Sequence, residues 1–367
     1  MTTPVLCEEI ATNNGKIIGV LTLNSEKTLN SLTLVMVDIM LAQLQRWQKN
    51  DQIAAVFIQG AGEKAFCAGG DVQALHKSSA DNPGGPCVDA ERFFDQEYRL
   101  DYLLHHYGKP TIAWGHGIVM GGGLGVFAGC SHRIATEKTR IAMPEVTIGL
   151  FPDVGGSYFL NTMPGQCGRF LALTGASING TDSLYAGIAN HLVSHSKKDD
   201  VMSLLLALDW SSPAIETQLD DMFSDQQLPA EDIPAGNLAA HQSLINDLCA
   251  GDDVEAIAAN IAALETADKW MQRAKAGLAN GSPLAVKWIF QQLEICKGLS
   301  LKAVFQQEIL LATNIVRHSE FPEGVRALLI DKDQNPQWQF KTLSDVPADS
   351  VAAFFVAPWP TNPLIDL

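Results

Sequence analysis

The sequence predicts an α/β fold whose C-terminal part is helical. Over about the first 190 residues, strand-like apolar runs alternate with helical patterns at close intervals, which is typical of α/β architecture. From 197 to 335 the patterns are helical, with almost no strand signal. The tail from Val346 holds four prolines and is expected to be extended. We therefore predict a core at 1–196, a helical region at 197–343 and an extended tail at 344–367.

Local signals mark the first strands and the first helix. Residues 16–23 form a β-branched run that predicts a strand, and residues 53–60 form a second one that ends at Gly60. Between them, Thr33 stands where a helix N-cap would stand, directly before an apolar pattern with helical spacing that begins at Leu34. These segments predict one strand–helix–strand unit.

The segments that follow continue this alternation. A helical pattern covers 90–105, a strand pattern covers 110–115, and a glycine-rich run at 119–128 opens another helix. A short strand pattern then covers 132–136. Much further along, the serine and proline at 282–283 have the form of an N-cap followed by proline at the first helical position.

The composition excludes some classes of partner. The chain has 367 residues, of which 25 are Lys or Arg and 41 are Asp or Glu, and its formal net charge is −16. A nucleic-acid binder needs a basic face and a polybasic membrane anchor needs clustered cations, so neither nucleic acid nor a membrane is expected as a partner. A small anionic ligand stays open, because a few backbone N–H groups can hold one.

The N-terminus and the cysteines give an expectation of cellular location. The first residues lack the basic and apolar stretches of a signal peptide, and Glu8 and Glu9 are early for a transit peptide. No stretch approaches the roughly 18 apolar residues of a membrane span. The seven cysteines are widely spaced without a C-x-x-C pair, which favours free thiols. We expect a cytoplasmic protein.

Two glycine-rich loops form the first candidate site. Gly69 and Gly70 follow one apolar strand pattern, the glycines at 121–123 follow another, and each loop precedes a helical pattern. Glycine lets backbone N–H groups come close to a ligand, and two converging N–H groups would form an oxyanion hole for acyl transfer. Two simple tight turns would explain the same glycines.

Two carboxylates eight residues apart form the second candidate site. Glu145 and Asp153 lie in an apolar segment that is broken by Pro144, Gly149 and Pro152. An acid that points inward there needs a partner or a raised pKa, and paired carboxylates in one cleft suit general acid–base or nucleophilic catalysis. The alternative is two surface acids on a loop, which is the more frequent case for an arbitrary pair.

Other reactive residue types are better explained by structure. Cys67 lies beside the first glycine loop without a neighbouring base, so a small core site suits it better than a nucleophilic role. His116 stands between two glycines, where a turn histidine is commoner than a catalytic base. The G-x-S-x-G motif of a serine hydrolase does not occur. The C-terminal acids lack metal-ligand spacing, so no metal is expected.

In combination, these motifs resemble the crotonase (enoyl-CoA hydratase/isomerase) superfamily. The resemblance implies a crotonase-like spiral of ββα units with a helical C-terminal region. It also implies an acyl-CoA thioester as substrate, so that coenzyme A is part of the substrate and no cofactor is needed. The superfamily often forms trimers, which leaves a homo-oligomer open. The segments that carry the resemblance are 64–71, 93–98, 117–125, 133–137, 143–160 and 321–338.

The resemblance also implies residue roles. Gly70, which precedes the Asp of the first loop, and Gly122, the middle glycine of the second, correspond to the two oxyanion donors. Glu145 corresponds to the catalytic carboxylate, and Asp153 to its catalytic partner in a branch that hydrolyses hydroxyacyl-CoA thioesters. Glu97 corresponds to a residue of the substrate pocket. The expected substrate-binding residues are therefore Glu97, Gly122, Glu145 and Asp153.

Gly125 is the position that separates the possible activities. A hydratase of this superfamily carries a second catalytic Glu two residues after the glycine triplet, where this chain has Gly125. Without that carboxylate, water cannot be held between two acids for addition to a double bond, so the resemblance implies thioester hydrolysis. The alternatives are another crotonase activity, an enoyl-CoA isomerase or hydratase, and a non-catalytic acyl-CoA-binding protein, which would not need the acids.

Overall fold

The computed structural model describes residues 3–367, so residues 1–2 of the predicted core lie outside the described residues. The chain forms two compact units, each built from three separate stretches. Both units contain residues from either side of the boundary predicted at 196. The first unit comprises Met1–Gly70, Leu100–Ile141 and Ile178–Gly236, and the second comprises Asp71–Arg99, Ala142–Ser177 and Asn237–Leu367.

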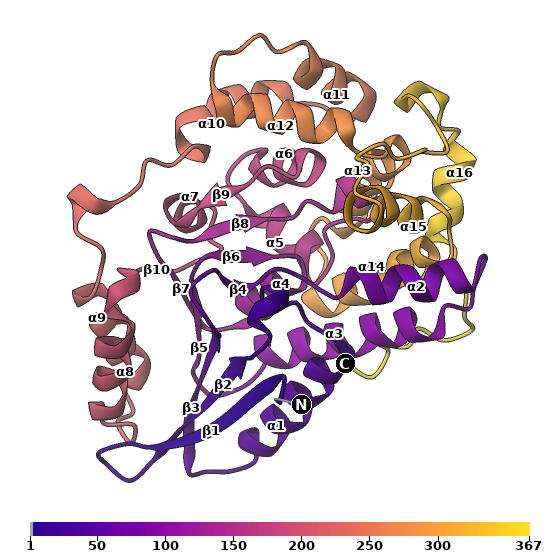
Figure 1. Ribbon diagram of the computed structural model, residues 1–367. Coiled ribbons are helices and arrows are strands. Elements are labelled where there is room, and N and C mark those ends of the chain that lie inside the picture. The colour runs from indigo at the N-terminus through magenta and orange to yellow at the C-terminus, as the bar shows by residue number, and fades with distance from the viewer. Residues whose placement is uncertain (1–2) are drawn as a thin grey trace. The chain divides into compact units, whose positions relative to one another are not determined.

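Within the described residues, ten strands form two sheets, which belong to the first unit apart from the last residue of β8. The larger sheet has the order β1-β2-β3-β5-β7-β10 and the smaller has the order β4-β6-β8-β9 (Figure 1). The strands are β1 (Val5–Ala11), β2 (Ile17–Leu23), β3 (Ile53–Gly60), β4 (Ala65–Cys67), β5 (Thr111–Gly115), β6 (Ile118–Met120), β7 (His132–Ala135), β8 (Arg140–Ala142), β9 (Ile178–Asn179) and β10 (His191–Leu192).

Successive strands alternate between the two sheets. β3, β5 and β7 join the larger sheet, while the strands that directly follow them, β4, β6 and β8, join the smaller one. Helices follow β4 and β6 before the chain returns to the larger sheet. As a result, the neighbouring strands from β2 to β10 in the larger sheet are parallel: β2 pairs with β3, β3 with β5, β5 with β7 and β7 with β10. The predicted spiral of ββα units is therefore confirmed.

The larger sheet carries an apolar core on one face. Side chains two residues apart on a strand share a face, and the aliphatic and aromatic residues at these positions are buried. Helices α8 and α9 place Val201, Leu205, Leu219 and Phe223 in the same cluster. The strand residues of the cluster are Ile18, Val20, Ala55, Phe57, Ile112, Trp114 and Ile134.

The helices follow the predicted distribution, with most of them after residue 196. The α-helices are α1 (Leu34–Gln48), α2 (Val72–Asp81), α3 (Val88–His105), α4 (Gly122–Gly129), α5 (Gly156–Thr162), α6 (Cys167–Thr174), α7 (Gly180–Tyr185), α8 (Lys198–Ala207), α9 (Ile215–Asp225), α10 (Leu238–Leu248), α11 (Val254–Ala263), α12 (Lys269–Asn280), α13 (Pro283–Cys296), α14 (Leu301–Val316), α15 (Glu320–Val325) and α16 (Ala348–Ala352). Shorter helical turns are η1 (Glu26–Thr28), η2 (Glu145–Ile148), η3 (His195–Lys197), η4 (Ala230–Asp232), the π-helical η5 (Arg326–Ile330), η6 (Leu343–Asp345) and η7 (Ala353–Phe355).

Two helix starts were predicted from local chemistry and are confirmed. The Thr33 hydroxyl accepts a hydrogen bond from the Met36 N–H at 3.3 Å at the start of α1. The Ser282 hydroxyl accepts one from the Ala285 N–H at 3.0 Å, and Pro283 is the first residue of α13. Such caps satisfy backbone donors that have no acceptor inside the helix.

The tail is not extended throughout, as the sequence had suggested. Residues 348–352 form α16, and η7 follows directly. Phe354 is buried rather than exposed, because its ring packs at 4.7 Å from the Trp288 ring and at 5.0 Å from the His318 ring. The apolar contact fixes the helical turn between the prolines, which proline spacing alone does not reveal.

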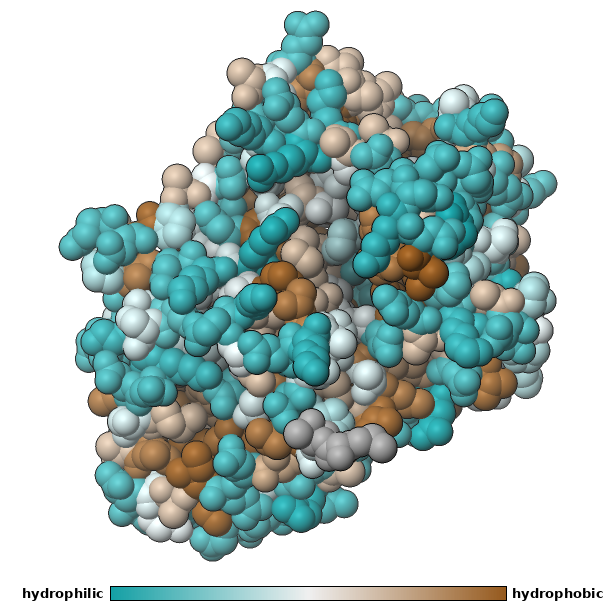
Figure 2. All heavy atoms as spheres, viewed as in Figure 1, coloured by the Kyte–Doolittle hydropathy of each residue, from teal (hydrophilic) through white to brown (hydrophobic). Residues whose placement is uncertain are grey.

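The polar residues lie mainly on the outside. Figure 2 shows polar side chains over most of the visible face, with apolar residues in separate patches. This distribution agrees with the excess of acids in the composition. Over residues 3–367, none of the helices combines the length and the apolar character that crossing a membrane requires.

Candidate active site

The two glycine loops lie against each other in the first unit. A side chain at Gly69 would place its Cβ 3.6 Å from the Met120 carbonyl oxygen and 3.9 Å from the Gly121 Cα. Gly69 has φ of 115° and Gly121 has φ of 45°, conformations that L-residues with side chains rarely adopt. Gly70, the first predicted oxyanion donor, follows directly and forms a bridge to Leu32. These contacts bring the two predicted loops together.

Gly122 is the first residue of α4, and the glycines here let the start of this helix lie close to β4. The first N–H groups of a helix have no acceptor within that helix, so the position of Gly122 suits the donor role that the resemblance implies. Gly123 permits α4 to approach β4, because a Cβ there would lie 2.5 Å from the Cys67 carbonyl oxygen. The Cys67 side chain is buried at this contact, as expected for a core residue.

His116 is also explained by structure. Its Nε2 lies 2.9 Å from the Gly62 carbonyl oxygen, and the ring is buried in the first unit. Burial lowers its pKa. A neutral imidazole that donates to a backbone carbonyl positions a turn, in agreement with the preferred interpretation of its sequence context.

Glu145 begins a single helical turn in the second unit. Pro144 precedes this turn, η2, and Gly149 ends it with φ of 64°. The Glu145 residue is only 5% exposed, and its Oε2 atom has no hydrogen-bond partner among residues 3–367. A buried carboxyl oxygen without a donor is costly. The alternative of a surface acid is therefore wrong for this residue.

Asp153 is equally buried, at 4% exposed, but it has a donor. The Tyr98 hydroxyl donates to Asp153 Oδ2 at 2.7 Å. Val154, directly after the acid, has φ of 54°, a conformation that costs a β-branched residue about 1–3 kcal/mol. Such local strain persists only where surrounding contacts fix the backbone, and it is concentrated at functional sites.

Glu308 supplies contacts that hold this strained loop. One carboxylate oxygen accepts the Gly155 N–H at 2.7 Å, and the other accepts the Ser157 N–H at 2.9 Å. Glu308 comes from the middle of α14 and is fully buried. Sequence reasoning missed it, although an acid among the apolar positions of a buried helix face is a visible signal. We describe Glu308 as a positioning residue for Asp153.

Burial dominates the electrostatics of these acids. It raises the pKa of Glu145 well above its usual range, and the charge of Asp153 adds to the effect. Burial also raises the pKa of Asp153 to about 6, although the Tyr98 hydrogen bond opposes it, and raises that of Glu308 to about 8. Burial therefore favours the protonated form of Glu145, while the Tyr98 hydrogen bond favours the ionised form of Asp153. Glu145 and Asp153 are called the acid pair below.

The predicted residues fall into two groups. Gly70 and Gly122 belong to the first unit, while Glu97, Glu145 and Asp153 belong to the second. Glu97 is buried in α3, directly before Tyr98. Tyr98 belongs to the segment 93–98 that carries the family resemblance. The hydrogen bond from its hydroxyl to Asp153 was not predicted, because nothing in the sequence pairs two residues 55 positions apart.

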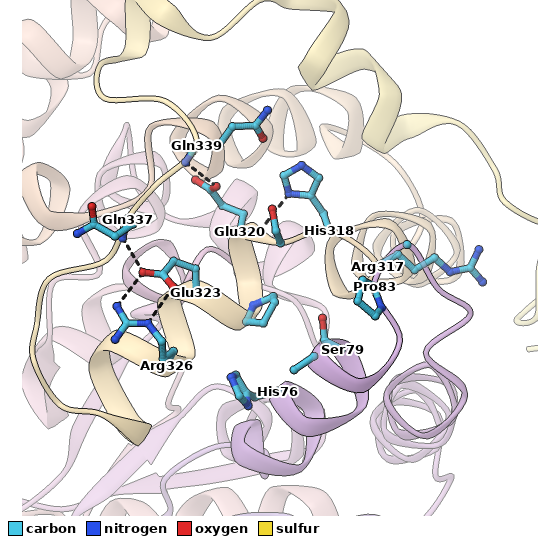
Figure 3. A pocket seen from close by; sticks show the side chains of 14 residues that line it. His76, Ser79, Pro83, Arg317, His318, Glu320, Glu323, Arg326, Gln337 and Gln339 are labelled. Atoms are coloured by element: carbon cyan, nitrogen blue, oxygen red, sulfur yellow. Dashed lines mark hydrogen bonds and ion pairs between the residues drawn. The ribbon is translucent and has the colours of Figure 1, made fainter.

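A second polar region of the second unit surrounds a cavity of about 660 Å³ (Figure 3). Arg326 contacts Glu323 at 2.8 Å, Asp331 at 2.6 Å and Asp333 at 2.7 Å. Glu323 also accepts the Gln337 N–H at 2.6 Å. The Arg326 hydrogen bond lowers the pKa of Glu323. These four charged residues, Arg326, Glu323, Asp331 and Asp333, are called the arginine cluster below.

Glu320 lines the same cavity and is also fully engaged. One carboxylate oxygen accepts from the Ser282 hydroxyl, and the other accepts the Gln339 N–H at 3.2 Å. Figure 3 shows Glu320 beside Gln339, and Glu323 between Gln337 and Arg326. None of the predicted catalytic acids lines this cavity. Its carboxylates are bound by protein donors, which suits a structural role.

Comparison with known proteins gives the family. The family model described as Enoyl-CoA hydratase/isomerase matches residues 18–355. The chain is 41% identical over 330 residues to a protein of Danio rerio named "3-hydroxyisobutyryl-CoA hydrolase, mitochondrial", covering 89% of this chain and 84% of that protein. It is 37% identical over 351 residues to the Homo sapiens protein of the same name, covering 95% and 88%.

Solved structures agree in fold. A carnitinyl-CoA dehydratase from Mycobacterium thermoresistibile superposes with a TM-score of 0.86 at 34% identity, covering 100% of both chains. An enoyl-CoA hydratase from Rhodobacter sphaeroides 2.4.1 superposes with a TM-score of 0.83 at 30% identity, covering 97% of this chain and 98% of that one. From its sequence, its ββα spiral and these relatives, the chain belongs to the enoyl-CoA hydratase/isomerase family.

Proposed function

We propose that this chain hydrolyses the thioester of a short hydroxyacyl-CoA, namely 3-hydroxyisobutyryl-CoA, to 3-hydroxyisobutyrate and CoA, a reaction of valine catabolism. The relatives that share 37–41% of its residues carry the name of this activity. The observation that carries the proposal is the buried acid pair, in which the Glu145 Oε2 atom has no hydrogen-bond partner among residues 3–367 and Asp153 accepts a hydrogen bond from the Tyr98 hydroxyl. A binding protein would gain nothing from burying an acid at this cost.

The proposal assigns the thioester oxygen to the N–H groups of Gly70 and Gly122. As the carbonyl carbon becomes tetrahedral, this oxygen becomes negative, and fixed N–H donors stabilise that charge. Removing one such donor typically costs about 10²–10³ in rate. Both donors are backbone amides, so side-chain substitutions elsewhere in the site leave them in place.

The acid pair would supply one proton and one carboxylate to the reaction. In one route, Glu145 passes its proton to Asp153 and attacks the carbonyl carbon, the C–S bond breaks, and Asp153 gives the proton to the departing CoA thiolate. Water then hydrolyses the Glu145 anhydride. In the other route, Glu145 passes its proton to Asp153 and then takes a proton from the water that attacks the carbonyl carbon; the C–S bond breaks, and Asp153 gives its proton to the departing CoA thiolate. Glu97 would bind the substrate hydroxyl. Single turnover in labelled water separates the two routes, because only the anhydride places labelled oxygen in Glu145.

The second candidate is hydration of an enoyl-CoA, the activity in the name of one structural relative. The structure of the chain offers the same fold for it, but Gly125 stands within α4 where a hydratase of the family carries its second catalytic Glu. The chain thus lacks, at this position, the second acid that hydratases of the family use to hold water for addition across the double bond. We therefore propose hydrolysis as the activity and keep hydration as the second candidate.

Parallel assays distinguish these activities. Release of the CoA thiol from 3-hydroxyisobutyryl-CoA is followed with a thiol reagent, and loss of the conjugated double bond is followed by absorbance with an enoyl-CoA. We expect thiol release to exceed hydration in kcat/KM by at least about 10³. Hydration without thiol release would overturn the proposal. A short panel of hydroxyacyl-CoA esters then defines the acyl group, since one methyl group changes discrimination by only about 1–3 kcal/mol.

Three further points remain proposals. We propose that no cofactor is required, which dialysis against a chelator during the thiol assay tests. The oligomeric state, for which a homo-oligomer was left open, is measured by light scattering. The cytoplasmic location expected from sequence stays a prediction; the names of the curated relatives include the word mitochondrial, so fractionation of cells is the relevant test.

A further inference from the structure

Two histidines and a carboxylate face one another in the first unit. His132 begins β7, and His191 begins β10, the parallel neighbour of β7 at the edge of the larger sheet. Asp220 and Glu216 lie one turn apart on α9, which runs beside this edge (Figure 1). Phe223 of the same helix packs against both imidazole rings, at 5.7 Å and 4.7 Å. The sheet and the helix thus fix the positions of all four polar groups.

The distances between these groups are too long for hydrogen bonds. Asp220 Oδ1 lies 3.8 Å from His132 Nε2 and 3.7 Å from His191 Nε2, and the three atoms all lie within 4.8 Å of one another. Hydrogen bonds between such atoms need roughly 2.7–3.2 Å. Ligand atoms around a tetrahedral Zn²⁺ ion lie about 3.3 Å apart, as bonds of about 2.0–2.1 Å require. Asp220 is exposed, so a small rotation of its side chain would bring its carboxylate oxygen to the shorter spacing that a Zn²⁺ ion requires.

The two rings are held in an orientation that suits ligation. Their planes are within 6° of parallel, with centroids 5.9 Å apart, and the residues are only 3% and 6% exposed. Ser131 Oγ donates to the Thr111 carbonyl and lies 3.0 Å from His132 Nδ1. When the serine hydroxyl donates to the Thr111 carbonyl, its oxygen accepts from His132 Nδ1–H, and in that tautomer the Nε2 lone pair is free to bind a metal ion. Metal-binding histidines typically make this kind of second contact.

The Nε2 atom of His191 gives independent evidence for a ligand at this place. It is buried and has no hydrogen-bond partner among residues 3–367. Elsewhere in the first unit, His195 Nε2 meets Glu63 directly at 2.8 Å, so a histidine and a carboxylate that pair alone approach more closely.

We propose that His132, His191 and Asp220 bind a divalent transition-metal ion, with Zn²⁺ as the probe. Two imidazole nitrogens and one carboxylate oxygen favour Zn²⁺ and its neighbours over Ca²⁺ or Mg²⁺, which prefer oxygen ligands. A water molecule completes four-coordination, and Glu216, with Oε2 at 3.7 Å from His132 Nε2, accepts from that water. The ion joins α9 to the edge strands of the sheet and is separate from the proposed thioester chemistry.

Calorimetric titration of the untagged, chelator-treated chain with Zn²⁺ tests the site. We expect one strong equivalent, and we expect Asp220→Asn to weaken its Kd by at least about tenfold. Asp221→Asn is the matched control, because Asp221 is an exposed acid of the same helix that no contact places beside the histidines. This control should bind Zn²⁺ as the unaltered chain does. Asp220 is exposed, so its substitution leaves the core packing intact.

The absorption of bound Co²⁺ and a substitution of His191 test the same site further. Co²⁺ bound by nitrogen and oxygen ligands should give visible absorption without the near-ultraviolet thiolate band that a cysteine site gives. His191→Gln should abolish the equivalent, with circular dichroism confirming that the variant is folded. Absence of a strong Zn²⁺ equivalent, a Kd unchanged by Asp220→Asn, or a thiolate band from the Co²⁺ form would each overturn the proposal.

Discussion

The acid pair and the arginine cluster are both rich in carboxylates, yet their chemistry differs. In the acid pair, Glu145 has a buried oxygen without a donor, and burial raises the pKa of both acids. In the arginine cluster, Arg326 contacts three carboxylates, and its hydrogen bond lowers the pKa of Glu323. Carboxylates that protein donors saturate stabilise structure, whereas carboxylates left short of donors keep protons that can be transferred.

The two regions also differ in what holds their backbone. The loop that carries Asp153 passes through the strained Val154 and is fixed by two amide hydrogen bonds to Glu308. In the arginine cluster, the hydrogen bonds of Arg326 join it to residues three to nine positions away. Backbone strain that surrounding contacts hold in place is concentrated at functional sites. The strained Val154, held by contacts of the distant Glu308, fits this pattern. The following predictions test this difference, from the largest effect to the smallest.

Glu145→Gln should have the largest effect on catalysis. The amide keeps the size of the side chain but can neither attack nor exchange a proton, so we expect thiol release to fall by about 10³-fold. Binding of a non-hydrolysable CoA thioether should change by less than about threefold, because the backbone donors stay in place. Stopped-flow thiol release and calorimetry measure the two quantities, and a parallel loss of binding would point to misfolding instead.

Tyr98→Phe should shift the pH dependence of the reaction. Below about pH 6 Asp153 becomes protonated and the rate falls. The Tyr98 hydroxyl stabilises the ionised form, so its removal raises the pKa of Asp153 and moves the acidic limb of the kcat profile to higher pH. We expect about a tenfold loss at pH 6 and a much smaller loss at pH 8. A uniform loss at every pH would mean that the hydroxyl only fixes geometry.

Glu308→Gln should change the pH dependence of stability. The folded chain raises the pKa of Glu308 from 4.5 to about 8, so this group favours folding below pH 4.5 and its contribution is lost as the pH rises through about 8. Glutamine does not titrate. The free energy of unfolding in urea should therefore fall less between pH 5 and pH 8 in the variant than in the unaltered chain. Equal slopes for both proteins would refute the raised pKa of Glu308.

Glu323→Gln should have the smallest effect on activity. The substitution removes one of the three charged partners of Arg326 and should lower Tm slightly, in a salt-dependent manner, since the pair is partly exposed and two other carboxylates still contact Arg326. The rate of thiol release per folded molecule should stay within about twofold of the unaltered chain. A loss of rate comparable with that of Glu145→Gln would assign the chemistry to the wrong region.

The predictable parts of the molecule are those that depend on neighbours in sequence. Thr33 and Ser282 cap their helices through residues three positions away, so the local pattern was sufficient. The segment with Glu145 and Asp153 was likewise recognisable, since its acids and breaks are adjacent. Glu308 was not found, because its contacts bridge about 150 positions and only the folded chain brings α14 to the loop.

The same limit explains other findings. His132 and His191 meet because β7 and β10 are neighbours in the sheet, and sequence gives no pairing of two short strands. The helical turn of the tail depends on Phe354 packing against Trp288. In each case the contact joins residues that are far apart in sequence, and a local sequence pattern does not identify such a partner.

The most direct test measures thiol release from 3-hydroxyisobutyryl-CoA by the unaltered chain, Glu145→Gln and Glu323→Gln in one experiment, at equal concentrations of folded protein. Both variants replace a carboxylate by its amide, so they differ only in the region that loses its acid. The account predicts a loss of about 10³-fold for Glu145→Gln and a nearly unchanged rate for Glu323→Gln. An undiminished rate in Glu145→Gln would contradict it.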